Sequence, residues 1–320
     1  MVNNMRKLTR SEVIGIIELI VCTMIWGLVF VAQKKASENV TAIFLTGIRF
    51  LIAGIIIIPV ALIFYKKDKN KDKYFSIKKT IIIGIFTGLA LGTATVIQQL
   101  GIERTSTGKA GFLTAMYIVL VPIFTFIIFR KKITYMQIVG IIVAVVGVGL
   151  LSLKNDFTIN LGDLLCMLGA IFFTVEIMIV DHYQGKVNAF ILSASCFLTI
   201  GIIASLVAIP VEGSKFEIAN VGKAIVPILF LGIGSSCIAY TLQNLGQQRI
   251  DGTPASLLMS LESVFALFFG IIIMGDRLNV KEWIGCVLLL IGVFVVQIFV
   301  KKDEEKKEES EEINELEEWF

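Results

Sequence analysis

The sequence predicts an all-α polytopic membrane protein with ten transmembrane helices in two inverted five-helix repeats. Three observations predict this fold: the apolar composition, ten apolar runs of membrane-spanning length, and a long-range sequence repeat. Of the 320 residues, 56% are hydrophobic and 17% are charged, and the mean hydropathy is +0.85. One core of a water-soluble domain cannot bury that much apolar surface, so we expect lipid to be the solvent.

The apolar runs have the length of membrane-spanning helices, because about 20 helical residues cross a hydrocarbon layer about 30 Å thick. Their hydrophobicity is continuous, whereas barrel strands alternate, and a helix satisfies its backbone polar groups within one segment. The first run is too long for the apolar region of a signal peptide and lacks a small-residue cleavage pattern after it. The ten expected spans are 13–33, 40–65, 80–100, 107–129, 133–153, 162–182, 187–209, 223–243, 254–274 and 280–300.

Positive charges in the short loops predict the orientation, since cytoplasmic loops are enriched in Lys and Arg. If the N-terminus is cytoplasmic, that side holds 19 of the 29 Lys and Arg residues and the opposite side holds 9. The remaining one, Arg49, lies within the second expected helix. We therefore expect a multi-pass protein of the cell (cytoplasmic) membrane with both termini in the cytoplasm.

The last twenty residues, 301–320, form a charged tail with ten acidic residues against four lysines, which we expect to be cytoplasmic and disordered or a frayed helix. All five cysteines fall inside apolar runs without a CxxC pattern. We therefore expect no disulfide, no metal and no cofactor. The expected partners are a small-molecule substrate and the lipid bilayer, not nucleic acid, and a homodimer is left open.

A repeat is visible when residues 94–148 are aligned with residues 239–293 at a constant offset of 145, without a gap. Fourteen of these 55 positions are identical, and they include Gln98, which aligns with Gln243. Shared apolar composition would give scattered matches of Leu, Ile and Val, so it does not explain identical Gln, Arg and Gly residues in register. We interpret the two segments as copies.

Weaker similarity continues upstream at an offset near 147, where Trp26 aligns with Phe173. The repeat therefore spans five helices. Because five is odd, the second copy begins on the opposite face of the membrane, and the two copies are inverted relative to each other. An inverted repeat can build inward-facing and outward-facing states around one central site.

The second copy ends in a recognisable order of motifs: LESVF at 261–265, GDRL at 275–278 and WIG at 283–285. This order resembles the EamA-type drug/metabolite transporters. The second repeat of that family typically ends in Leu-Glu-Pro-x-Phe, then Gly-Glu-Arg-Leu, then Trp-Ile-Gly.

Two positions depart from the family pattern. Ser263 stands where the family usually has proline, and Pro122 lies one helical turn after its expected place at Ile118. The resemblance covers nearly the whole chain except the tail. It implies ten helices in two inverted halves and the export or exchange of amino acids or related metabolites. The expected units are a first EamA-like repeat at 11–153, a second at 161–300, and the tail at 301–320.

Ionisable residues inside the apolar runs are candidate functional residues, because a charge at mid-depth costs about 3 kcal/mol or more on insertion scales. Arg49 and Glu262 lie near mid-depth, where they either form a structural ion-pair network or contact substrate. Glu176 lies nearer the cytoplasmic end of its helix, where it could couple protons or bind a substrate amine. Glu18 is a weaker candidate of the same kind.

Neutral polar and aromatic residues form a second group of candidates. Gln98 and Gln243 could be matching gates near opposite faces, or they could join helices at about 1 kcal/mol each. Trp26, Tyr117 and Tyr240 either line a cavity or pack in the core. We expect no catalytic residue, and the candidate substrate or coupling residues are Trp26, Arg49, Gln98, Tyr117, Glu176, Tyr240, Gln243 and Glu262.

The leading interpretation is a secondary active transporter that exports or exchanges a small metabolite by alternating access, with proton coupling as an option. The alternatives are a membrane enzyme, or a channel or scaffold that pumps no solute. An enzyme is disfavoured because His182 is the only histidine and, with Asp181 beside it, makes neither a nucleophile–base pair nor a metal site. Substrate identity, direction, coupling ion and oligomeric state are left open.

Overall fold

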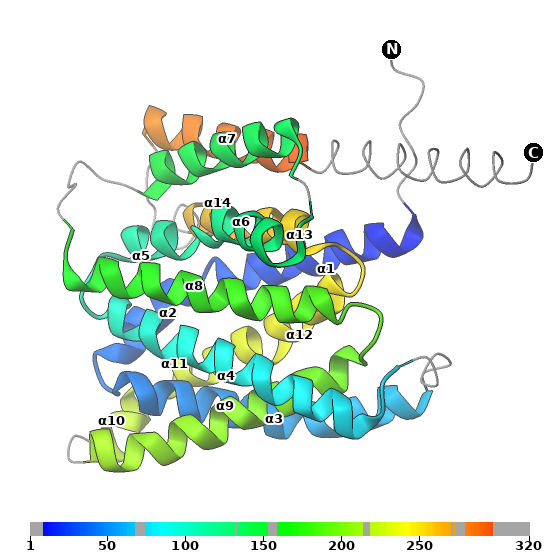
Figure 1. The fold of residues 1–320 in the computed structure, drawn as a ribbon. Coiled ribbons are helices and arrows are strands. Elements are labelled where there is room, and N and C mark those ends of the chain that lie inside the picture. The colour runs from blue at the N-terminus through cyan, green and yellow to red at the C-terminus, as the bar shows by residue number, and fades with distance from the viewer. Residues whose placement is uncertain are drawn as a thin grey trace, which may run out of the picture.

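The computed structural model describes a helical chain (Figure 1). Within the described residues there are helices and turns but no strand. The structure describes residues 9–67, 74–131, 133–152, 159–213, 218–269, 272 and 279–296. The expected tail 301–320 and the GDRL motif at 275–278 lie outside the described residues.

Seven helical segments of the described chain are long and apolar enough to cross a membrane. They correspond to the first four expected spans and to the sixth, seventh and eighth. The prediction of an all-α multi-pass membrane protein is therefore confirmed. The seven segments are Arg10–Ser37, Ala42–Lys67, Ile77–Ile102, Lys109–Phe129, Leu161–His182, Ala189–Glu212 and Ile225–Gln247.

Two further expected spans correspond to shorter described helices. The expected span 133–153 corresponds to α7 (Tyr135–Ser152), whose apolar part, Tyr135–Leu150, is shorter than the seven segments above. Of the expected span 280–300, residues 280–296 are described and helical. A total of ten spans stays a prediction.

Side-chain caps define several helix starts. Thr9 and Glu12 form a capping box at the start of α1, and Asn160 and Asp163 form another at the start of α8. These contacts satisfy backbone N–H groups that the first helical turn leaves unpaired. Besides α7 and the unlabelled helix at 280–296, the described helices are α1 (Arg10–Trp26), α2 (Val29–Ser37), α3 (Ala42–Lys67), α4 (Ile77–Ile102), α5 (Thr107–Thr114), α6 (Tyr117–Phe129), α8 (Leu161–His182), α9 (Ala189–Glu212), α10 (Ile218–Lys223), α11 (Ile225–Leu229), the π-helical η3 (Phe230–Ala239), α12 (Tyr240–Gln247), α13 (Gly252–Met259) and α14 (Glu262–Phe269).

The helices in the fourth and ninth expected spans are interrupted at repeat-related positions. α5 and α6 are separated at Ala115 and Met116, and α13 and α14 are separated at Ser260 and Leu261. Each position of the first break is related to one of the second by the offset of 145 found in the sequence. The expected span 254–274 therefore corresponds, as far as it is described, to two half-helices.

The helices that begin the two repeats run in opposite directions. In Figure 1, α1 begins at the right beside the N-terminus, whereas α8 begins at the left and ends at the right. Each packs closely against the third helix of the other repeat. A Cβ atom on Gly246 of α12 would lie 3.2 Å from the carbonyl oxygen of Gly15 in α1. The repeat-related contact joins α4 and α8, where a Cβ on Gly101 would lie 2.9 Å from the carbonyl oxygen of Gly162.

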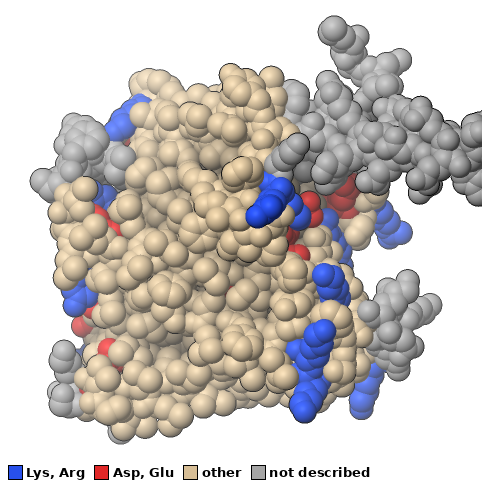
Figure 2. Space-filling model, viewed as in Figure 1, with Lys and Arg blue, Asp and Glu red and all other residues tan. Residues whose placement is uncertain are grey.

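The outer surface matches a lipid environment. The face in Figure 2 is almost free of charged side chains across its middle, and Lys and Arg gather toward its left and right sides. Exposed apolar side chains are frequent on the membrane-length helices, for example Ile55 on α3, Phe86 on α4 and Ile127 on α6. Exposed apolar surface on this scale is unusual for a soluble monomer and is expected for a helical bundle in lipid.

Candidate functional site

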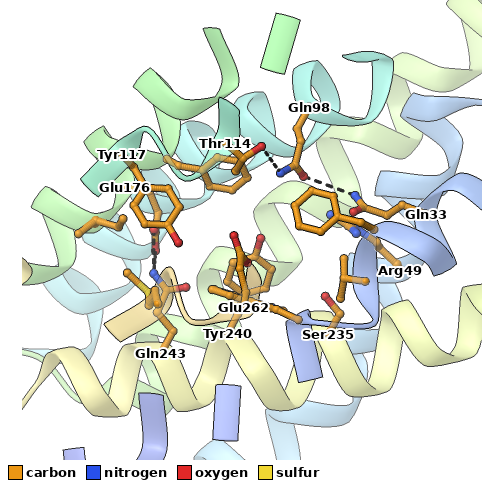
Figure 3. Close-up of a pocket in the computed structure, with 16 residues that line it drawn as sticks. Gln33, Arg49, Gln98, Thr114, Tyr117, Glu176, Ser235, Tyr240, Gln243 and Glu262 are labelled. Carbon is orange, nitrogen blue, oxygen red and sulfur yellow. Dashed lines mark hydrogen bonds between the residues drawn. The ribbon is translucent and has the colours of Figure 1, made fainter. Parts of the chain in front are cut away.

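A cavity lies between the two repeats and is lined by all eight residues selected from the sequence (Figure 3). Its volume of about 40 Å³, counted for the centres of water molecules, is room for a few waters. The structure brings the eight candidates together, while their roles stay predictions. The other lining residues are Val29, Phe30, Gln33, Thr114, Phe173, Ile177, Ser235 and Met259.

Most of the cavity wall consists of residues that occupy equivalent places in the two repeats. α1, α2 and α8 supply pairs at the offset of 147, and the third and fourth helices of each repeat supply pairs at the offset of 145. The cavity therefore lies where the two repeats face each other. The pairs are Trp26 with Phe173, Val29 with Glu176, Phe30 with Ile177, Gln98 with Gln243, Thr114 with Met259, and Tyr117 with Glu262.

A close helix contact lies at the break between α1 and α2. A Cβ atom on Gly27 would lie 2.8 Å from the backbone of Phe265 and of Ala266 in α14, closer than any real Cβ contact. Only glycine fits at this point, since it has no Cβ. The contact places Trp26, at the end of α1, and Val29, at the start of α2, against the cavity.

Arg49 is a buried cation on α3 that lines the cavity. Its Nε and Nη1 atoms have no hydrogen-bond partner, and its Cζ lies 5.1 Å from the centroid of the Phe50 ring. Among the described residues it forms no ion pair with Glu262 or any other carboxylate. The ion-pair network that was one of the two sequence interpretations is thus not formed among the described residues, and the roles of Arg49 and Glu262 stay predictions.

Tyr117 and Glu262 are the first residues of the half-helices α6 and α14. The helix breaks place these side chains beside the cavity, at helix starts where the helix dipole is positive. The Tyr117 hydroxyl and one Glu262 carboxylate oxygen, Oε1, have no hydrogen-bond partner. Figure 3 shows the hydroxyl and the carboxylate pointing into the same space.

Glu176 is held by a chain of amides between α8 and α12. Gln243 Nε2 lies 3.0 Å from Glu176 Oε2 and 3.4 Å from Oε1, and it also lies 3.0 Å from Oε1 of Gln247. Gln247 in turn donates to the carbonyl oxygen of Ile177 at 3.3 Å. Glu176 is therefore connected to the third helix of its own repeat, whereas Glu262 is not.

Gln98 forms the corresponding link in the first repeat. It donates to the Thr114 hydroxyl at 3.0 Å and accepts from Gln33 Nε2 at 3.5 Å. In this single conformation both repeat-related glutamines, Gln98 and Gln243, are hydrogen-bonded. They join helices within each repeat, and a gating role for either one stays a prediction.

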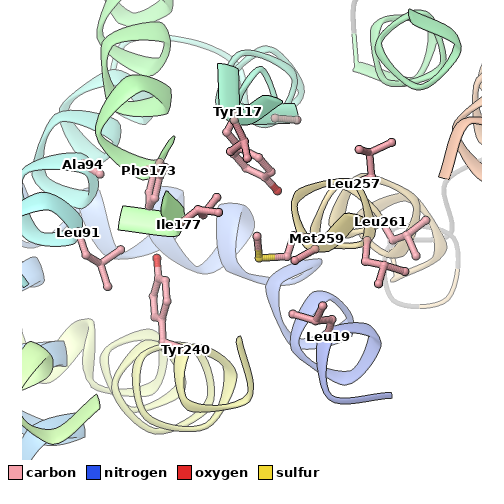
Figure 4. Packing of buried hydrophobic residues seen from close by; sticks show 14 of the residues in the cluster. Leu19, Leu91, Ala94, Tyr117, Phe173, Ile177, Tyr240, Leu257, Met259 and Leu261 are labelled. Carbon is pink, nitrogen blue, oxygen red and sulfur yellow. The ribbon is translucent and has the colours of Figure 1, made fainter. Parts of the chain in front are cut away.

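Aromatic and sulfur-bearing side chains form the apolar part of the wall. The Trp26 and Tyr240 rings meet edge to face with centroids 4.9 Å apart, and Tyr240 lies 5.8 Å from Phe50. Figure 4 shows Tyr240, Phe173 and Met259 within the buried cluster that continues from the cavity. The cavity therefore combines a few polar groups with an apolar lining, as small-molecule sites usually do.

Besides Gln33, two polar lining residues, Thr114 and Ser235, were not among the eight candidates selected from the sequence. Thr114 is the last residue before the break in the fourth helix, and the sequence contains no proline or glycine there to mark it. Ser235 was detectable, since two serines interrupt the apolar run within η3. Glu18 is not among the lining residues and forms a 2.7 Å ion pair with Arg249.

A metal site is not evident in the part of the chain that the structure describes. There, no group of three or more His, Cys, Asp or Glu side chains is placed to hold an ion. The five cysteines are buried and free.

Comparisons with known proteins agree with the architecture. An uncharacterized transporter of Archaeoglobus fulgidus is 28% identical over 282 residues, which cover 88% of this chain and 85% of that protein. The uncharacterized transporter YoaV of Bacillus subtilis is 22% identical over 288 residues, covering 88% and 95% of the two chains. A protein crystal structure with 18% sequence identity has the same fold, with a TM-score of 0.72 over 92% of this chain and 98% of the other. The model of the EamA-like transporter family matches residues 13–153 and again 160–298, so the chain belongs to this family and contains its domain twice.

Proposed function

We propose that this protein is a secondary active transporter that exports or exchanges a small metabolite, an amino acid or a related compound, across the cytoplasmic membrane. The observation that carries the proposal is the buried cavity lined by equivalent residues from both repeats. A site shared by two repeats can be opened to either side when the repeats exchange conformations. The relatives are named as transporters, which favours this activity over a membrane enzyme.

The proposal includes ten spans in two inverted five-helix repeats. The opposite directions of α1 and α8 and the matching glycine contacts at Gly15 and Gly162 support the inversion. It also includes both termini in the cytoplasm, which rests on the excess of Lys and Arg on that side.

Two contact regions on either side of the cavity have the position expected of seals in an alternating-access cycle. On the proposed cytoplasmic side, α1 contacts α12, and Glu18 pairs with Arg249. On the opposite side, α8 contacts α4, and Asp163 accepts a hydrogen bond from Thr105 and forms an ion pair with Lys109 at 3.2 Å. Transport would require these two contacts to open in turn.

Proton coupling is proposed for Glu176. Its carboxylate lines the cavity and accepts from Gln243, so protonation would change the bond that connects α8 to α12. A protonated carboxyl group can donate as well as accept, whereas an ionised one only accepts. The protonation state would thereby alter the contact between the first and third helices of the second repeat.

The experiment that tests the function begins with metabolite profiles of cells that lack or overproduce the protein. Solutes whose levels change are then assayed by counterflow in proteoliposomes containing the purified protein. We expect labelled solute to accumulate against unlabelled internal solute only in the presence of the protein. Profiles that change without any counterflow of the changed solutes would contradict transport and favour an enzyme or a scaffold. An ionic current without counterflow would favour a channel.

A further inference from the structure

We infer that the cavity binds a dipolar solute across the boundary between the repeats. In this arrangement Arg49 of the first repeat binds the anionic group, and Glu262 of the second repeat binds the cationic group, with the Tyr117 hydroxyl beside Glu262 (Figure 3). The inference rests on the proposed transport function and assigns the two charged subsites within it.

The two repeats contribute opposite charges to the cavity. Both lining carboxylates, Glu176 and Glu262, come from the second repeat, and the lining guanidinium of Arg49 comes from the first. The position equivalent to Glu262 is Tyr117, and the position equivalent to Arg49 is Cys196, at offsets of 145 and 147. Equivalent positions of the two repeats thus line the same cavity but carry different charges.

The polar groups that define these subsites lack partners. The Arg49, Tyr117 and Glu262 side chains are 2%, 4% and 6% exposed. Arg49 Nε and Nη1, the Tyr117 hydroxyl and Glu262 Oε1 have no hydrogen-bond partner. Leaving such buried groups unpaired costs free energy, which a solute with complementary groups would recover. Arginine donates and suits a carboxylate-like acceptor, whereas an ionised glutamate accepts and suits an ammonium donor.

A solute with one charge would leave part of the site uncompensated. An anion would satisfy Arg49 and leave Glu262 unpaired, and a cation would do the reverse. Since the described residues contain no ion pair between Arg49 and Glu262, a dipolar solute is the complement that serves both.

Glu176 is not the cationic subsite in this arrangement, because Gln243 lies within hydrogen-bond distance of both of its oxygens. The apolar body of the solute would lie against Trp26, Tyr240 and Met259. Binding would then join the two repeats through the solute, so that occupancy favours a particular arrangement of the halves.

The test measures how much each charge of the solute contributes in wild-type protein and in variants. The probes are labelled L-alanine, L-threonine, L-leucine and L-phenylalanine in proteoliposomes. For each amino acid, the competitors are the same compound and the carboxylic acid and amine that lack one of its charged groups. The variants are Glu262→Gln and Arg49→Gln, and the matched controls are Glu38→Gln and Lys35→Gln, which alter exposed charges at the end of α2.

In wild-type protein and in both controls, we expect the loss of either charged group to weaken competition by about tenfold or more. In Glu262→Gln, removing the ammonium group from the competitor should weaken competition by less than about threefold, whereas removing the carboxylate group should weaken it as much as in wild-type protein. In Arg49→Gln, we expect the opposite pattern. Glu262→Asp and Arg49→Lys retain the charges and should retain part of both effects. These two variants and the Gln variants should each elute as a single species in size-exclusion chromatography, which would exclude loss of folding as the cause of the changes.

If removing a charged group weakened competition equally in wild-type protein and in both Gln variants, the inference would be overturned. So would transport of a singly charged or uncharged solute, found by metabolite profiling, in preference to every dipolar probe. In either case solute still moves and the transport function stands. Absence of protein-dependent flux for all probes and all profiled solutes would remove the transport function, and the inference with it.

Discussion

At the scale of single residues, Glu176 and Glu262 differ in their surroundings although both line the cavity. Glu176 is linked to Gln243 and through it to Gln247, whereas Glu262 Oε1 has no partner. The sequence identifies both as carboxylates in apolar helices, but it does not distinguish these environments. The difference arises from the amides of α12, which face Glu176 from a helix about 70 residues further along the chain.

This difference predicts that Glu176→Gln uncouples transport from the pH gradient. An amide at this position does not titrate, so net flux should no longer respond to an imposed pH gradient, while counterflow at equal pH persists. The measurement compares gradient-driven uptake with counterflow in the same proteoliposomes. An unchanged response to the gradient in Glu176→Gln would exclude this residue from coupling.

The partner amide gives a second prediction at the same scale. In Gln243→Leu, Glu176 would lose its hydrogen-bond donor, and we expect the pH dependence of flux to shift, because the ionised and protonated forms of the carboxyl group use this contact differently. The repeat-related variant Gln98→Leu is the matched control, since it removes the amide bonded to Thr114 and leaves Glu176 unchanged. The same shift in both variants would contradict a specific role for the Gln243 contact.

At the scale of elements, the interrupted helices are the feature that places Tyr117 and Glu262. Hydropathy predicts continuous spans here, and the family pattern directs attention to prolines. However, Pro122 lies inside α6, and the second repeat has Ser263 where the family has proline. The breaks at 115–116 and 260–261 therefore precede both positions. Tertiary packing determines where they occur, and a single sequence does not reveal it.

Close packing between α7 and the helix at 280–296 gives a prediction about stability. A Cβ on Gly147 would lie 2.5 Å from the backbone nitrogen of Leu289, and backbone cannot move aside as a side-chain end can. Gly147→Ala should therefore destabilise the protein by about 1–3 kcal/mol, seen as a lower Tm in detergent. Gly222→Ala is the control, because nothing lies within 4 Å of a Cβ there. Equal Tm values for the two variants would contradict the packing described for these helices.

Near the ends of α2 and α8, a charged side chain binds the end of a neighbouring helix. Lys34 donates to the carbonyl oxygens of Ile102 and Glu103 at 2.8 and 3.2 Å, at the C-terminal end of α4. Asp181, at the position related to Lys34 by the offset of 147, accepts from the backbone N–H of Gly252 at 2.6 Å, where α13 begins. At equivalent positions of the two repeats, a cation thus stabilises the C-terminal end of one helix and an anion stabilises the N-terminal end of another, as the helix dipole favours.

We expect Lys34→Met and Asp181→Ala each to lower stability by about 1 kcal/mol through loss of these contacts. Asp181→Asn retains an acceptor oxygen and should have a smaller effect than Asp181→Ala. Thermal unfolding of the three variants in one detergent provides the measurement. If Asp181→Asn and Asp181→Ala were equally destabilising, charge and not the hydrogen bond to Gly252 would be the source of the stability.

At the scale of the whole molecule, the sequence predicts much of the architecture because lipid imposes simple rules on length and hydropathy. Seven expected spans correspond to helices of membrane length, and the offset of 145 in the sequence reappears as paired cavity residues such as Gln98 and Gln243. All eight candidate residues line one cavity, because polar groups in apolar helices are costly unless they face a shared interior. The hydrogen-bond partners and the full set of lining residues, including Ser235, depend on helix packing that the composition does not specify.

The most direct test of the account is whether the central cavity can be reached from both sides of the membrane. Ser235→Cys introduces a thiol of similar size at the cavity, in a chain whose five native cysteines are replaced by alanine. Lys35→Cys and Lys79→Cys, exposed at opposite ends of the molecule, report labelling from one side each. In right-side-out and inside-out vesicles, we expect a membrane-impermeant thiol reagent to label Ser235→Cys from both sides, and transported solute to protect it. Labelling from one side only, or from neither, would contradict a central site with alternating access.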